Sequence, residues 1–182
     1  MAWAGAALAQ QAHLSLPEDC AKVWTISKPF AECTFHREDG TMVSISLFQM
    51  SQPVRRVARA LKIKPGDLSR DVMEQLLMMT EAALSAPHNH PPDVEILRRD
   101  ARPAPKSARP EGFDACIQYD FDFRLRGERS DERGLRCMKL LPSGRLLSAS
   151  SSVAWQHRDQ RSGRLPGFKA FAERVMSSLR MR

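Results

Sequence analysis

The amino-acid sequence predicts an α+β domain. We expect an antiparallel β-sheet of about five to seven strands, packed against a central amphipathic helix and a C-terminal helix. Apolar residues alternate with polar ones in several segments, as is typical of half-buried strands. Over about 70–85 and over 168–179, apolar residues instead recur at helical spacing. Short turn sequences join consecutive strands, and short connections favour antiparallel pairing.

The first half of the chain is expected to form a strand, a hairpin and two helices. A short strand is predicted at 22–26. An Asp-Gly step between the alternating runs 33–37 and 42–48 indicates a β-hairpin. A short helix is predicted over 53–62, because it has a proline near its first position and one apolar face. The amphipathic helix over about 70–85 follows, with a serine placed to cap it.

The second half is expected to alternate strands with loops before the closing helix. The predicted strands are 94–97, 117–125, 135–141 and 145–155. The predicted loops, rich in proline, glycine or charge, are 101–112, 127–134 and 158–167. The strand 117–125 alternates so regularly that one of its faces must be buried. We expect the apolar stripe of the closing helix to pack on the face formed by Tyr119, Phe121 and Phe123.

This order of elements resembles the PsbP-like α/β sandwich, including the DcrB-type bacterial exported proteins. The likeness covers roughly residues 20–181. It lies in the N-terminal hairpin, the central helical segment, the run of strands and the closing helix with Phe168, Phe171 and the Ser177-Ser178-Leu179 end. Members of that fold are mostly binding, adaptor or assembly proteins, so the resemblance implies an interaction role. It carries over no functional residues.

The N-terminus has a feature of exported proteins. The first nine residues end in Ala7-Leu8-Ala9, the small-x-small pattern of a signal-peptidase site. We interpret 1–18 as a residual signal-peptide tail and flexible N-terminus, and 19–182 as a single α+β domain. The alternative is a disordered Ala-rich terminus. No apolar run reaches the roughly 20 residues that span a bilayer, so no transmembrane segment is expected. The predicted location is the periplasm or the cell exterior.

Four cysteines support that location, because an even number is expected in an oxidising compartment. They are Cys20, Cys33, Cys116 and Cys137, and three pairings are possible. A Cys20–Cys33 bond is favoured, since a short hairpin could bring the two together. Cys116 and Cys137 lie on consecutive predicted strands. They could form a bond or could equally be two small buried hydrophobes.

The chain carries a formal net charge of +7. Basic residues cluster on and after the predicted short helix, and they are candidates for binding an anion or an acidic partner: Arg55, Arg56, Arg59, Lys62 and Lys64. The same segment with the next helix weakly matches a helix-turn-helix, whose second helix would enter the major groove. The second helix is too apolar around its surface for that role, so nucleic acid is not the expected partner. For the net positive charge as a whole, a scattered basic surface that reflects the Arg-rich composition is favoured over a functional anionic partner.

The sequence contains few candidates for chemistry. His88 and His90 form an H-x-H pair with Asp93 nearby, which are weak metal candidates because a further ligand is missing. A solvated loop is the favoured interpretation. Asp120 and Asp122 could act as a carboxylate pair, but they fit the solvent face of an amphipathic strand better. No nucleophile elbow, phosphate-binding loop or H-E-x-x-H helix occurs. No cofactor is therefore expected.

Three functions are compatible with these observations. The leading hypothesis is an exported, periplasmic, non-catalytic binding or adaptor domain that recognises a protein partner, such as an immunity or envelope-assembly factor. One alternative is a binder of nucleic acid or another anionic surface through the basic residues. The other is a hydrolase or metalloprotein whose site is assembled from distant residues.

Overall fold

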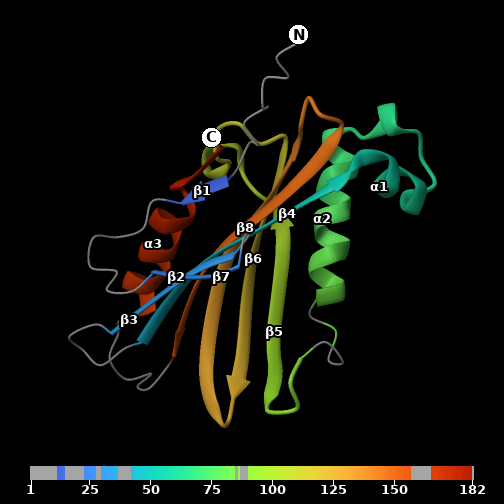
Figure 1. Cartoon of the computed structure of the whole chain (residues 1–182). Helices are drawn as coiled ribbons and strands as arrows, with labels where there is room; N and C mark the ends of the chain where they lie inside the picture. Colours follow the sequence, from blue (N-terminus) through green and yellow to red (C-terminus); the bar gives the residue numbers. More distant parts are fainter. Residues whose placement is uncertain are drawn as a thin grey trace.

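A seven-stranded antiparallel sheet forms the centre of the molecule (Figure 1). The structure is a computed structural model, and it describes residues 12–14, 23–27, 30–36, 42–84, 86, 90–156 and 165–181. Within that part of the chain the strand order is β2-β3-β4-β8-β7-β6-β5. The strands are β2 (Val23–Ser27), β3 (Phe30–His36), β4 (Met42–Pro53), β5 (Val94–Pro103), β6 (Ala115–Leu125), β7 (Glu128–Leu140) and β8 (Arg145–Gln156). The predicted fold class is confirmed.

Three α-helices accompany the sheet in the described residues: α1 (Val54–Leu61), α2 (Arg70–Leu84) and α3 (Leu165–Met176). Two short 3-10 turns, η1 (Pro65–Asp67) and η3 (Lys106–Ala108), lie between elements. The predicted central helix is confirmed as α2. Its first turn is capped by Ser69, whose hydroxyl accepts a hydrogen bond from the backbone N–H of Val72 at 3.4 Å.

Helices α2 and α3 cover opposite faces of the sheet, and Figure 1 shows one on each side of it. Neighbouring residues of a strand point to opposite faces. On β6, Ala115 and Ile117 pack with α2 residues such as Leu77, whereas Cys116 packs with α3 residues such as Val175. The sheet therefore has two separate apolar cores. We call its two sides the α2 face and the α3 face.

The C-terminal helix does not pack where the sequence suggested. Tyr119 lies two residues after Ile117 on β6 and so belongs to the α2 face. The buried residues of α3 contact Cys137 and Val153 on the other face. The expected contact between this helix and the aromatic residues of 117–125 is wrong. Alternation showed that two faces exist, but it could not show which helix covers each one.

The predicted loop 127–134 is wrong as well, because β7 begins at Glu128. The turn is only Arg126-Gly127, with φ of 51° and 85°. Two consecutive residues with positive φ form the tight turn that suits the twist of a hairpin. The charges that suggested a loop are paired across strands: Arg129 contacts Asp122 at 3.3 Å, and Arg133 contacts Asp120 at 2.5 Å. Strand β5 likewise runs on to Pro103, into the start of the predicted loop 101–112.

A small second sheet joins the two ends of the described chain. Strand β1 (Ala12–Leu14) pairs antiparallel with β9 (Leu179–Met181). Leu179 is fully buried, and Ala12 belongs to the core under α3. Residues 12–14 fall within the segment 1–18 that we interpret as a flexible terminus. The rest of that segment lies outside the described residues, and the division into 1–18 and 19–182 stays a prediction.

Candidate binding site

A groove runs over the α2 face of the sheet between α1 and α2, and we call it the α1–α2 groove. Its volume is about 190 Å³. Strands β4, β7 and β8 form its floor, and the two helices form its walls. The lining residues are Phe48, Met50, Gln52, Arg56, Val57, Ala60, Leu61, Leu76, Thr80, Arg136, Met138 and Ser148.

The floor of the groove exposes apolar side chains that a folded protein usually buries. Phe48 is 40% exposed and Met50 is 47% exposed. Both lie on β4, and Ser148 of β8 is paired with Met50. Helix α2 covers β5, β6 and β7, so within the described part of the chain this side of β4 and β8 has no helix over it beyond α1. Adjacent exposed apolar side chains are typical of a binding surface.

A buried ion-pair cluster lies near the C-terminal end of α2, beside this groove. Glu81 of α2 is buried, and its two carboxylate oxygens contact Arg99 of β5 at 2.6 Å and Arg136 of β7 at 2.8 Å. The guanidinium of Arg136 also lies over the ring of Tyr119, 5.8 Å from its centroid. Its Nε is buried and makes no hydrogen bond to any described residue. Arg136 is thus held in place by Glu81 and Tyr119 while one edge faces the groove.

The polar cluster continues across the sheet from Tyr119. The Tyr119 hydroxyl donates a hydrogen bond to Glu132 at 2.9 Å. Burial raises the pKa of the Glu132 carboxyl, while hydrogen bonds with Ser152 and Tyr119 act in the opposite direction. Burial and the nearby Glu132 charge raise the pKa of Tyr119 well above its usual value. The hydroxyl oxygens of Ser152 and of Ser46 on β4 lie 2.8 Å apart, within hydrogen-bond distance.

The five basic residues predicted as a partner-binding cluster gather around α1. All are exposed: Arg55, Arg56, Arg59, Lys62 and Lys64. None of them forms an ion pair with another described residue, whereas most arginines of the sheet do. Arg56 lines the groove. The prediction that these residues bind a partner stays a prediction, and of the five the structure places Arg56 at the exposed apolar floor.

Of the weak metal candidates, His90 and Asp93 lie in the described residues, and each makes another contact. His88 lies outside the described residues. His90 stacks on Phe121, with ring centroids 5.8 Å apart. Asp93 instead pairs with the Nε of Arg126 at 3.1 Å. Among the described residues, no cluster of three metal-binding side chains occurs.

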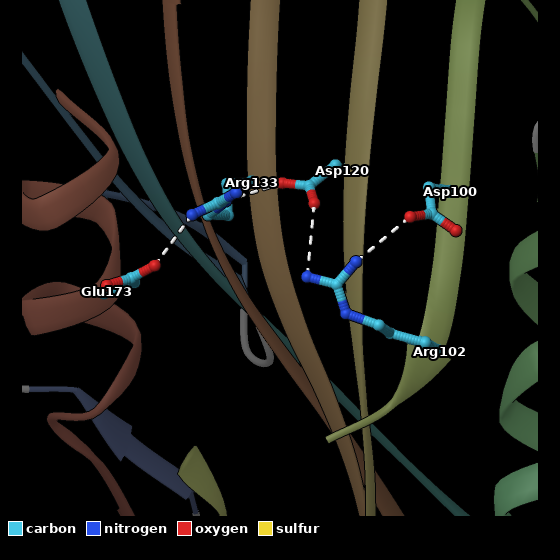
Figure 2. A network of polar contacts seen from close by, with 5 residues as sticks. All are labelled: Asp100, Arg102, Asp120, Arg133 and Glu173. Atoms are coloured by element: carbon cyan, nitrogen blue, oxygen red, sulfur yellow. Dashed lines mark hydrogen bonds and ion pairs between the residues drawn. The ribbon is translucent and has the colours of Figure 1, made fainter. Parts of the chain in front are cut away.

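The two aspartates considered as a carboxylate pair each contact an arginine. Figure 2 shows Asp120 between Arg133 and Arg102, with Arg133 also contacting Glu173 of α3. The Arg133 and Glu173 side chains lie 2.8 Å apart. Asp122 contacts Arg129, as described above. These contacts tie strands and helix together on the α3 face, away from the groove.

Cys116 and Cys137 face each other on β6 and β7 and form a disulfide. Of the two interpretations left open for them, the bond is therefore the one that the structure shows, and both residues are fully buried. Cys20 lies outside the described residues, so the Cys20–Cys33 bond stays a prediction.

Sequence reasoning missed the groove and the polar cluster behind it. Glu81 looked like one polar position of an amphipathic helix, and Arg136 like one charge of a strand. Tyr119 was predicted to be buried, but its partners were not. One available signal was the Leu-Arg-Cys alternation at 135–137, which places Arg136 on the opposite face from Leu135 and Cys137.

Comparisons with known proteins show the fold alone. No family model matches the chain, and no curated protein matches its sequence. The fold is similar to that in the crystal structure of LpqN, a protein involved in cell envelope biogenesis of Mycobacterium tuberculosis. The match covers 94% of this chain and 83% of that chain, with a TM-score of 0.52 and 12% sequence identity. It does not confirm the finer resemblance to PsbP-like and DcrB-type proteins. No described helix is long and apolar enough to cross a membrane.

Proposed function

We propose that this chain is an exported, envelope-associated domain without catalytic activity that recognises a protein partner. The observation that carries the proposal is the exposed apolar floor of the α1–α2 groove beside the cations of α1, which form no ion pair with any residue that the structure describes. Exposed apolar side chains rimmed by charge are what protein interfaces present before they meet their partner. The ion pairs described on the sheet hold strands and helices together, and this supports a binding role over a catalytic one.

Two further observations support export. Cys116 and Cys137 form a disulfide. Disulfides persist in oxidising compartments and are rare in the cytosol. The fold is similar to that of LpqN, which is involved in cell envelope biogenesis. By analogy, we propose that this chain is also associated with the cell envelope. We also propose that it is related to the PsbP-like and DcrB-type exported proteins.

The test uses photo-crosslinking in cells that express the full chain. A photoreactive residue replaces Met50 in the groove, and the control replaces Met79, which is 64% exposed on α2 but does not line the groove. We expect a discrete crosslinked protein from position 50 and none from position 79. Equal, diffuse labelling at both positions would contradict the proposed function.

Export is tested separately by trapping thiols in intact cells. We expect Cys116 and Cys137 to be oxidised, and so not to react with the thiol-trapping reagent after denaturation, because the chain would have folded outside the cytosol. A fully reduced pair in freshly lysed cells would count against the proposed location but would leave partner recognition standing.

A further inference from the structure

We propose that the α1–α2 groove binds a peptide segment of the partner that carries a large apolar side chain flanked by carboxylates. This inference rests on the proposed function and names the chemistry of the segment recognised. The apolar side chain would contact Phe48 and Met50 on the floor of the groove. The carboxylates would contact Arg56 on the wall and Arg136 at the edge.

The size of the groove favours an anchoring side chain. Pockets for small molecules usually enclose roughly 300–1,000 Å³, and this groove holds about 190 Å³. Interfaces obtain most of their affinity from a few large side chains that enter such recesses. The groove therefore fits one anchor of a larger partner better than it fits a whole cofactor or metabolite.

The positive charge in and beside the α1–α2 groove favours an acidic partner. None of the described residues that line the groove is acidic. The five cations of and after α1 have no ion-pair partner in the described part of the chain, so a bound carboxylate would not have to displace one. Arg136 is already oriented by Glu81, and its buried Nε has no hydrogen-bond acceptor among the described residues. A preorganised guanidinium binds a carboxylate at a low entropic cost.

The sheet topology determines how the segment can bind. Strand β4 is paired with β3 on one side and with β8 on the other. The pairing with β3 covers 42–48, whereas 49–53 is paired only with β8 among the described strands. The groove itself lies on the face of the sheet and is lined by side chains of β4, β7, β8 and the two helices. We therefore expect recognition by side chains laid across that face, as in helix-in-groove complexes.

The probe is a random-peptide display library selected on the purified full chain. We expect enrichment of peptides in which aspartate or glutamate flanks leucine, phenylalanine or tryptophan. The affinity of an enriched peptide is then measured by fluorescence anisotropy for the wild type and for variants that circular dichroism shows to be folded. Met50 is 47% exposed and Arg56 is exposed, so both sites tolerate substitution without core damage.

We expect Met50→Asp and Arg56→Glu each to weaken peptide binding by about ten-fold or more. Lys106→Glu is the control, because it changes the net charge equally at an exposed position of η3 outside the groove. We expect it to change affinity less than about two-fold, with the small loss coming from long-range charge alone. Equal losses in Arg56→Glu and Lys106→Glu would overturn the proposed site.

Three further outcomes would overturn the inference. One is a selection without acidic–apolar enrichment. The others are displacement of the peptide by duplex DNA, or stronger binding to phosphatidylglycerol vesicles than to peptide, each of which would assign the cations to a different class of partner. If the crosslink from position 50 still forms in cells after any of these results, the proposed function holds and only the acidic segment is wrong.

Discussion

Among single residues, Gly134 and Tyr119 show how tightly the polar cluster is built. Tyr119 pairs with Gly134 across β6 and β7, and its ring lies over the glycine. A Cβ at position 134 would overlap the carbons and hydroxyl of that ring. Tyr119 cannot move aside without losing its hydrogen bond to Glu132 and its contact with Arg136. A residue without a side chain is therefore required here.

We predict that Gly134→Ala lowers the free energy of unfolding by about 1–3 kcal/mol, the usual cost of overpacking. Urea denaturation followed by fluorescence measures the change. Gly66→Ala is the control, because a Cβ at Gly66 meets nothing within 4 Å. An equally small effect of both substitutions would show that Tyr119 does not lie over the strand as described.

Glu132 gives a prediction about pH. Burial raises the pKa of its carboxyl in the folded state, so its protonated form is favoured there. Such a group contributes most to stability below its unfolded pKa, and the contribution is lost as pH rises through the folded pKa. Glutamine cannot ionise, but its amide oxygen can still accept the Tyr119 hydrogen bond.

We therefore predict that Glu132→Gln gains stability relative to the wild type as pH rises from about 4 towards 7, the range above the ordinary glutamate pKa. Urea midpoints of both proteins across that range give the difference. The two should differ least at the acidic end. Parallel profiles would mean that the carboxyl is not buried as described.

Among the elements, the β6–β7 pair is held by its backbone ladder and by the Cys116–Cys137 disulfide. The bond spans a sequence separation of 21. Closing a loop of this order stabilises a fold by about 3 kcal/mol in the chain-entropy model. We predict a loss near that size for the double variant Cys116→Ala/Cys137→Ala, measured by urea denaturation. Reductant should lower the free energy of unfolding of the wild type by breaking this bond, whereas the variant has no bond at these positions to break.

Helix α3 is attached to the sheet by its buried apolar residues and, at its exposed side, by Arg133 (Figure 2). Arg133 is mostly buried and contacts both Asp120 and Glu173. Without it, Arg102, whose guanidinium lies 3.9 Å from the carboxylate, is the one cation among the described residues that still pairs with Asp120. Glu173, by contrast, is 61% exposed, so water can replace its partner.

We predict that Arg133→Met costs about 1–3 kcal/mol, because a partly buried carboxylate loses its main partner. Glu173→Gln should cost less than about 0.5 kcal/mol, as exposed ion pairs usually do. Thermal denaturation of the two variants compares them directly. A larger loss in Glu173→Gln would mean that the ion pair, and not the apolar stripe, attaches α3.

The elements also show what the sequence could predict. Periodicity predicted α2, β6, β8 and the second half of β7, because local pattern and burial agree there. Local pattern failed at 127–134, where charges that look solvated are paired across strands. It also failed to place α3, because either face of the sheet offers an apolar surface. The site was harder still, since Glu81, Tyr119 and Arg136 lie on three separate elements and meet only after folding.

On the scale of the whole molecule, the two halves of the chain meet along β4 and β8. Ile45 is paired with Val153, and the Ser46–Ser152 contact joins residues 106 apart in sequence. In contrast, β6, β7 and β8 follow one another through short turns. Long-range pairing has to overcome loop-closure entropy before it gains contacts, so it forms late. We expect the β6–β7–β8 meander to form before β4 joins it.

Two buried residues test this order of events. Leu135 lies within the meander and Ile45 lies on β4, and both are almost fully buried. Truncation to alanine should cost each about 2–5 kcal/mol. We predict that Leu135→Ala mainly slows folding and that Ile45→Ala mainly speeds unfolding, as stopped-flow chevron plots would measure. The β4 floor of the groove would then be completed last. If Ile45→Ala instead slows folding as much as Leu135→Ala, the β4–β8 pair belongs to the nucleus and both halves assemble together.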